Sequence, residues 1–437
     1  MSSRIHLTLF VGAALAALGG CSDSGSTPPT PTDAATDAAH DASPTDVPNV
    51  TDAGTDVPVT DAGDGGTDGG TTCAPTRALV ATSNYAMGGW ALGPVATPTA
   101  LAALAGTAAD QDHGPVQSGC LVFDLQRGND AVDVLDPAHL PMVAHHIPLR
   151  PAGVDAGMGY LSNPQDAITL GATRVYVAQL ASPRIAILDP TRDGMAAVTG
   201  SVDLSPVRSP LDTDPSGSPE PVAFARSGAR VYVALENLSS FAPVTNGTLA
   251  VIDPATDTLV DTDPTTPGVQ PIALSNRNPI AMVPAGDGRV AVSEAGVVAF
   301  MPPQVLDGVI EAVDLVAGHP VTAQRVTEMQ LGGDVSGIVM FDATHGWVVV
   351  SVLGTDGGTG ENRVVPFDLG AATVGAAVLH TGSIGGIGLA PDGTVWVLDR
   401  STGHSGVRVF RHDTGAEVTT AAVSTGPYPP YGLAFVP

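Results

Sequence analysis

One unit recurs along most of the chain, and it constrains the possible fold more than any other feature. Around residue 164 it reads PQDAITLGATRVYVAQ followed by SPRIAILDP, and around residue 221 it reads PVAFARSGARVYVALEN followed by GTLAVIDPATDTLV. Short runs that alternate apolar and polar residues, separated by Gly, Pro, Asp and Asn, are typical of four short strands joined by turns. One such unit cannot bury its apolar face alone, so the copies must stack.

The copies are regularly spaced. The central residues of the second strand of each unit are Leu79, Val122, Tyr176, Tyr232, Ala291, Val349 and Trp396, between 43 and 59 residues apart. This period is typical of the four-stranded blades of a β-propeller. We therefore predict an all-β fold, with one propeller of about seven blades over residues 73–437. Six blades is the alternative, because residues 88–119 repeat only weakly.

The last segment of the chain predicts how the ring closes. Residues 431–437 copy the first strand of a unit, whereas the strand at residues 78–84 has no obvious first strand before it. We expect the two to pair in blade one, which would remove the exposed sheet edge.

An Asp follows the third strand in most copies, and three of these residues precede Pro. This pattern is typical of a turn in which the carboxylate accepts backbone amides, so we expect structural turns rather than catalysis at Asp136, Asp189, Asp253, Asp314, Asp368 and Asp413.

The pairing of RVYVA with AVIDPATDTLV resembles the YVTN-type β-propeller repeat of bacterial and archaeal surface proteins. The resemblance covers roughly residues 78–437. It implies the propeller fold and says little about function, because the same ring serves enzymes, receptors and scaffolds.

The amino terminus predicts export. Arg4 precedes an apolar run from Leu7 to Leu18, which suits a signal peptide and is too short to span a bilayer. Leu18-Gly19-Gly20-Cys21 resembles the bacterial lipobox, which implies a signal peptide at residues 1–20 and a multiply acylated Cys21, palmitate included, that anchors the protein in a membrane. Cleavage elsewhere and plain secretion is the alternative.

Residues 21–72 predict a disordered tether. From Ser22 to Thr72 there are ten Asp, no Lys or Arg and no aromatic residue, so this stretch cannot bury enough apolar surface to fold. A flexible chain of this length reaches about 40 Å on average. Calcium binding by the Asp run is a weaker reading, because the carboxylates lack fixed geometry.

Two cysteines remain beyond Cys21. An even pair in an exported protein predicts a disulfide between Cys73 and Cys120, which would fasten the start of the propeller to an early blade. Two separate buried thiols are the alternative.

Charge and motifs exclude several functions. The net charge of -27, with no Lys at all, repels nucleic acid. No nucleophile elbow, HExxH, CxxC or P-loop occurs, so we predict no catalytic residue and no cofactor. His145 and His146 are neighbours on a strand and point to opposite faces, so they cannot chelate one metal.

Propellers usually bind ligands over the central channel, where the loops before the innermost strands converge. Here those loops supply a lone arginine, four acids or amides with candidate metal-binding oxygens, and further polar side chains: Asn163, Gln165, Asp166, Glu220, Arg277, Asn278, Asp334, Ser336 and Tyr431. Arg277 could bind an anion, or else neutralise nearby carboxylates. Asp212, Asp214 and Ser216 form a weak candidate for Ca²⁺, since Ala223 stands where an EF-hand needs Glu.

We therefore expect a monomeric, non-catalytic binding or scaffold lipoprotein, anchored to a bacterial membrane, the outer membrane foremost, and facing the periplasm or cell surface. Its ligand is a protein, a glycan or a small molecule. The alternative is a lactonase-like hydrolase whose channel residues Asp166, Glu220, Asn278 and Asp334 hold a divalent metal.

Overall fold

The computed structural model describes residues 73–104, 110–150, 162–214, 216–239, 242–299, 301–355 and 359–437. The signal peptide, the acylated Cys21 and the tether predicted for residues 1–72 lie outside the described residues. Inside these ranges no helix combines the length and the apolar character that a membrane crossing requires.

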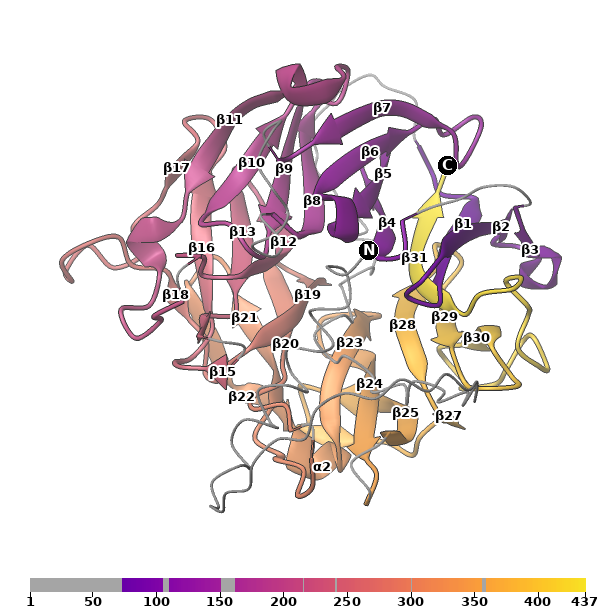
Figure 1. Cartoon of the computed structure of the whole chain (residues 1–437). Helices are drawn as coiled ribbons and strands as arrows, with labels where there is room; N and C mark the ends of the chain where they lie inside the picture. The colour runs from indigo at the N-terminus through magenta and orange to yellow at the C-terminus, as the bar shows by residue number, and fades with distance from the viewer. Residues whose placement is uncertain are drawn as a thin grey trace, which may run out of the picture.

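Seven small antiparallel sheets surround a common axis (Figure 1). The colour in Figure 1 runs once around the ring and brings the yellow carboxyl-terminal strand beside the indigo first strand. The chain is therefore a seven-bladed β-propeller, as its repeats predict. The weakly repeating residues 88–119 supply the outer strands of blade 1 and the inner strand of blade 2, which excludes the six-bladed alternative.

The first four blades, given from the inner strand outward, have the following strands. Blade 1 contains β31 (Pro430–Val436), β1 (Arg77–Ser83), β2 (Gly88–Pro94) and β3 (Ala102–Ala103). Blade 2 contains β4 (His113–Ser118), β5 (Leu121–Gln126), β6 (Ala131–Leu135) and β7 (Val143–Pro148). Blade 3 contains β8 (Pro164–Gly171), β9 (Arg174–Gln179), β10 (Arg184–Leu188) and β11 (Val198–Asp203). Blade 4 contains β12 (Pro221–Ser227), β13 (Arg230–Leu235), β16 (Thr248–Asp253), β17 (Thr258–Leu259) and β18 (Ile272–Ala273).

The last three blades complete the ring. Blade 5 contains β19 (Pro279–Gly286), β20 (Arg289–Glu294), β21 (Val309–Asp314) and β22 (His319–Thr327). Blade 6 contains β23 (Asp334–Met340), β24 (His345–Leu353), β25 (Thr359–Asp368), β26 (Thr373–Val374) and β27 (Leu379–Thr381). Blade 7 contains β28 (Ile384–Leu389), β29 (Thr394–Asp399) and β30 (Gly406–Arg411), and two isolated bridges extend its outer edge. A short ribbon, β14 (Leu238–Ser239) and β15 (Ala242–Pro243), and one helical turn, α2 (Glu328–Leu331), lie between blades.

The ring closes where the sequence predicts. Strand β31 pairs with β1 in an antiparallel register that places Leu79 opposite Ala434. The Arg77 Nε donates a hydrogen bond of 2.7 Å to the carbonyl oxygen of Pro437. Each of the seven residues predicted to be equivalent lies on the second strand of its own blade.

The core is divided among the blade interfaces. Seven clusters of buried apolar side chains occur, and each joins two neighbouring blades. At the closure, the fully buried Trp396 of blade 7 packs edge-to-face against Phe435 of β31, with ring centroids 5.7 Å apart. Blade-to-blade packing therefore stabilises the ring in the way that stacked repeats require.

The predicted Asp turns form at five of six positions. Backbone amides donate hydrogen bonds to the carboxylates of Asp136, Asp189, Asp253, Asp314 and Asp368. Asp413 instead pairs with the guanidinium of Arg411, at 2.7 Å. The position is structural in all six blades, but in blade 7 an arginine replaces the amides.

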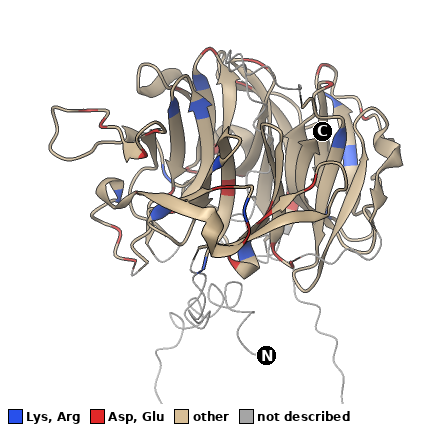
Figure 2. Cartoon of the chain, turned by 90° about the horizontal axis from the view of Figure 1, so that it is seen from above, with Lys and Arg blue, Asp and Glu red and all other residues tan. Residues whose placement is uncertain are grey.

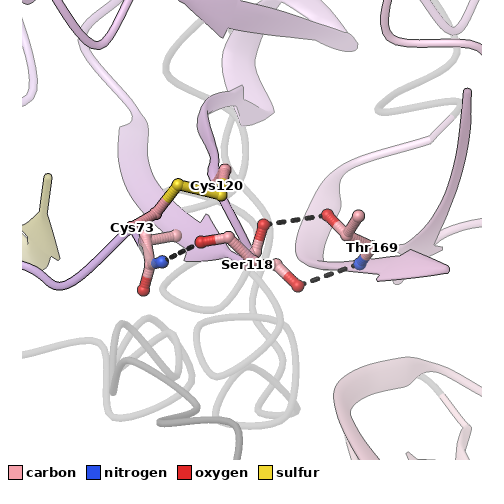
Figure 3. Close-up of a disulfide and its surroundings, with 6 residues drawn as sticks. Cys73, Ser118, Cys120 and Thr169 are labelled. Carbon is pink, nitrogen blue, oxygen red and sulfur yellow. Dashed lines mark hydrogen bonds between the residues drawn. A yellow bond between two sulfur atoms is a disulfide. The ribbon is translucent and has the colours of Figure 1, made fainter. Parts of the chain in front are cut away.

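The predicted disulfide joins Cys73 to Cys120, with Cα atoms 5.3 Å apart (Figure 3). Cys120 lies in the turn between β4 and β5. Beside it, the Thr169 amide and hydroxyl of β8 donate hydrogen bonds to the hydroxyl and the carbonyl oxygen of Ser118. The bridge therefore ties the first described residue to a turn that blade 3 also holds.

Candidate functional site

One end of the ring collects the predicted channel residues. Neighbouring strands are antiparallel, so the inner strands begin at the same end at which the second strands finish. We call this end the entry face. The structure places every predicted channel residue there, in the first residues of an inner strand or directly before it: Asn163, Gln165, Asp166, Glu220, Arg277, Asn278, Asp334, Ser336 and Tyr431. That they bind a ligand stays a prediction.

Three of these residues share an unusual backbone conformation. Asn163, Glu220 and Asn278 have φ values of 51°, 52° and 56°, and each precedes the proline that begins an inner strand. In each blade the carbonyl oxygen of this residue accepts the amide that follows the second strand, from Leu180, Glu236 and Ala295 respectively. For a non-glycine residue this left-handed geometry costs on the order of 1 kcal/mol or more. Such strain is concentrated at functional sites.

Three further candidates occupy β-bulges. Gln165, Ser336 and Tyr431 stand where the register between an inner strand and its neighbour shifts, and similar shifts occur at the start of β12, β19 and β28. Only β4 pairs without a shift within its described residues. A bulge redirects a side chain out of the regular alternation of a strand. Six of the seven inner strands therefore begin with the same device.

Hydrogen bonds and ion pairs connect several blades across the entry face. The Tyr431 hydroxyl donates to Asp112 at 3.2 Å, and Asp112 lies 3.5 Å from the buried Arg127 guanidinium. Burial raises the pKa of Asp166 to about 7, while the amides of Phe224 and Ala167 and the charge of Arg127 oppose the rise. The Phe224 amide reaches Asp166 at 2.7 Å from the next blade, so this carboxyl group joins blades 3 and 4.

Two carboxyl groups lie together in blade 4. Burial raises the pKa of Glu220 to about 9, and the charges of Glu236 and Asp212 raise it further, whereas the Leu238 amide opposes the rise. Burial alone raises the pKa of Glu236 to about 8. Both groups are therefore largely neutral carboxylic acids at pH 7.

A second pair of carboxyl groups lies in blade 5. Glu311 accepts the Ser275 amide and Glu294 accepts the amide of the next residue, Asn276, each at 2.9 Å. Burial and the neighbouring Glu311 raise the pKa of Glu294 well above its usual value. Its buried Oε1 has no conventional donor, as expected when two carboxyl groups share one proton. The pair holds the loop that leads into β19.

Two further acids lie between blades 5 and 6 and at the start of blade 6. Glu328 of α2 accepts the amides of Gly308 and Val335 at 2.7 and 2.9 Å, and burial raises its pKa to about 8. Burial also raises the pKa of Asp334 to about 6, and its Oδ1 is buried without a hydrogen-bond partner. The hydroxyl of Ser336 donates to the Val349 carbonyl at 3.3 Å.

Four residues of this face escaped the sequence analysis. Arg127, Glu236, Glu294 and Arg400 stand at the last residue of a second strand or within one or two residues of its end. The repeats carried a signal for them, because second strands close on polar residues in RVYVALE, RVAVSE and VWVLDR. Strand ends that meet the entry face are thus as informative as the loops before the inner strands.

The weak calcium candidate is organised around an arginine. Arg208 Nε donates to Asp212 Oδ2 at 2.6 Å, and its Nη2 donates to the Asp214 carbonyl at 2.6 Å. The Asp214 amide donates to Asp212, and the Ser216 amide donates to Asp214. The guanidinium therefore already supplies a positive charge to this loop. No group of three His, Cys, Asp or Glu suited to a metal occurs among the residues that the structure describes.

The histidine pair is divided as predicted. On β7, His145 pairs with Asp193 at 3.3 Å and His146 pairs with Asp133 at 2.5 Å. Their side chains therefore serve different neighbours and do not converge on one ion.

Charged residues are sparse on this ring, which Figure 2 shows as a largely tan ribbon with few blue segments. The chain contains 17 Arg and 44 acidic residues. Because acidic residues outnumber arginines, each arginine on the entry face lies in a protein of negative net charge.

Comparison with known proteins identifies the fold and no family. No protein-family model matches the chain, and no curated protein matches it. Among solved structures, a putative 6-phosphogluconolactonase from Bacteroides fragilis shows 13% identity and a TM-score of 0.50, covering 84% of this chain and 99% of that one. Apo AztD from Citrobacter koseri shows 13% identity and a TM-score of 0.47, covering 82% and 98%. Identities this low show the propeller fold alone.

Proposed function

We propose that this protein is an exported, lipid-anchored β-propeller that binds a ligand through its entry face without catalysing a reaction. The lipobox-like Cys21 supplies the anchor, and residues 21–72 supply the spacer. The similar structures support only the fold, so the function is inferred from the residues of this protein.

The position of the disulfide is the observation that carries the proposal. Cys73, where the spacer meets the propeller, is bonded to Cys120 in the turn that follows β4. The entry face lies at the opposite end of β4, whose six residues span about 20 Å. A tether attached at one end of the strands presents the other end outward, away from the membrane.

The chemistry of the entry face favours binding over catalysis. A general acid or base needs an oxygen that can reach a substrate, whereas Asp166 and Glu328 use both of theirs to accept backbone amides. These acids position loops, which is what a rigid binding surface requires.

The lactonase-like alternative fits the described residues poorly. Its metal would need oxygens from Asp166, Glu220, Asn278 and Asp334. Both carboxylate oxygens of Asp166 already accept hydrogen bonds from backbone amides, at 2.7 and 2.8 Å. Glu220 gives one oxygen to the Leu238 amide, which leaves a single oxygen for a metal. We derive no metal-dependent step from this site.

Cell fractionation tests the anchor. The unaltered chain should partition with membranes and incorporate labelled palmitate, whereas Cys21→Ala should release a folded protein into the periplasm or medium. Ser22→Ala is the matched control and should remain in membranes. Continued membrane attachment of Cys21→Ala would overturn the anchoring proposal.

A further inference from the structure

Arg400, on the entry face, has no carboxylate partner among the residues that the structure describes. Arg400 directly follows β29, and among the described residues its guanidinium donates to the Tyr85 hydroxyl at 2.9 Å and, weakly, to the Ser83 carbonyl. Ion pairs to carboxylates occur at nine other described arginines: Arg127, Arg150, Arg174, Arg192, Arg208, Arg230, Arg363, Arg408 and Arg411. No described carboxylate pairs with Arg400, so in a chain with a net charge of -27 its positive charge remains available to an anionic ligand.

Two tyrosines position this guanidinium. The Arg400 Cζ lies 4.9 Å from the ring centroid of Tyr85 and 5.2 Å from that of Tyr431, and the two rings meet edge-to-face at 5.7 Å. Tyr431 is buried at the β31 bulge and donates to Asp112, whose charge is committed to Arg127. This acid therefore pairs with Arg127 rather than with Arg400. Cation-π contact fixes the arginine without cancelling its charge.

The backbone around the cluster is shaped to expose Tyr85. This residue has φ of 62° and a 42% exposed side chain, a strained conformation for an aromatic residue. The Ser83 hydroxyl accepts its amide at 2.9 Å, and the Asn84 side chain accepts the amides of Ala86 and Met87. These hydrogen bonds keep Tyr85 on the surface, although an aromatic side chain usually gains free energy from burial.

A glycine on the neighbouring inner strand makes room for the arginine. A Cβ atom at Gly385 would lie 2.8 Å from Arg400 Cδ and 2.8 Å from the Pro430 carbonyl oxygen. Gly385 stands at the register shift of β28, where β8, β23 and β31 place Gln165, Ser336 and Tyr431. Its missing side chain lets the arginine stem lie against the inner strand.

We propose that Tyr85, Arg400 and Tyr431 form a binding site for a carboxylate-bearing sugar, with Arg400 pairing with the carboxylate and Tyr85 packing on the ring. The guanidinium fork matches a carboxylate in two parallel hydrogen bonds. An exposed tyrosine offers a flat apolar surface with a polar rim, which suits the C–H face of a pyranose. This inference rests on the proposed function and names its ligand class.

The charge of the chain favours a singly charged ligand. With a net charge of -27, the protein repels a phosphate with nearly two negative charges more strongly than a carboxylate with one. The site therefore selects uronic acids over sugar phosphates.

Calorimetry on the full-length chain carrying Cys21→Ala tests the proposal, with a galacturonic acid trimer as the probe. We expect binding of the trimer, no binding of the matching neutral galactose trimer, and none of inorganic phosphate. Arg400→Gln should weaken binding at least tenfold, and Arg400→Lys should recover part of it. Tyr85→Phe should retain more affinity than Tyr85→Ala.

The matched control is Arg289→Gln, which removes an arginine without an ion pair at the opposite end of blade 5 and should leave affinity unchanged. If Arg400 only stabilises the interface between blades 7 and 1, its variants would lower the melting temperature and leave the affinity for the trimer unaltered. That result would overturn the proposal. Binding of a peptide carboxylate in place of the trimer would overturn it equally. Neither outcome touches the membrane anchoring tested through Cys21.

Discussion

Replacing Glu236 with Gln should remove a large part of the pH dependence of stability. Glu236 directly follows β13, its side chain is buried, and burial alone raises its pKa to about 8 from a usual 4.5. An acid whose pKa is higher in the folded state stabilises fully below pH 4.5. That stability is lost as the pH rises toward 8, because the unfolded chain releases the proton first.

The magnitude follows from the two pKa values. Between pH 5 and pH 7 the ionisation of Glu236 in the unfolded state should cost the protein about 2 to 3 kcal/mol, at about 1.4 kcal/mol per pH unit. Gln has the same shape and does not titrate, so Glu236→Gln should not incur this loss. Any cost of burying the Gln amide is the same at both pH values and cancels.

Urea unfolding at pH 5, 6 and 7 measures the effect. Relative to the unaltered protein, Glu236→Gln should gain about 2 to 3 kcal/mol between pH 5 and pH 7. Asp287→Asn, which changes an exposed acid in the turn between β19 and β20, is the control and should show no such trend. A difference for Glu236→Gln that stays constant across these pH values would show that the folded protein ionises Glu236 freely, and would refute the reasoning.

Three further predictions follow from the fold. Reduction of the disulfide, or a Cys73→Ser and Cys120→Ser double variant, should lower the free energy of unfolding by about 4 kcal/mol, since the bridge closes a loop of 47 residues; equal urea midpoints with and without reductant would contradict this. Deleting residues 430–437 removes the inner strand of blade 1 and should abolish cooperative thermal unfolding, as followed by circular dichroism; a deletion variant that melts normally would refute the closure argument. Arg208 already supplies the positive charge at Asp212, so Ca²⁺ and chelator should leave the melting temperature unchanged, whereas a clear rise with Ca²⁺ would place a calcium ion there.

The repeats were sufficient to predict the ring. Apolar alternation identified the second strand of every blade, and the copy at residues 431–437 identified the closure. These features depend on local pattern and on the need to bury one face of each sheet, which sequence records directly. The turn at Asp413 departed from the pattern because Arg411, two residues away, competes for the carboxylate.

The entry face was harder to predict because its decisive contacts are distant in sequence. Arg400 and Tyr85 are 315 residues apart and meet only because blade 7 closes on blade 1. The contact also needs the absence of a side chain at Gly385 and a left-handed tyrosine. Neither feature belongs to the repeat, so the periodicity that predicts the strands does not predict this glycine or the conformation of this tyrosine.

Photo-cross-linking in intact cells that produce the protein tests most directly that the entry face is the binding face. A photoreactive side chain would replace Met87, which is 55% exposed in the loop between β1 and β2, and separately Val316, which is 84% exposed between β21 and β22 at the opposite end of the blades. We expect a discrete adduct from position 87 that Arg400→Gln diminishes, and none from position 316. Adducts from position 316 alone would contradict this expectation, because the ligand would then bind on the side to which the proposed tether attaches.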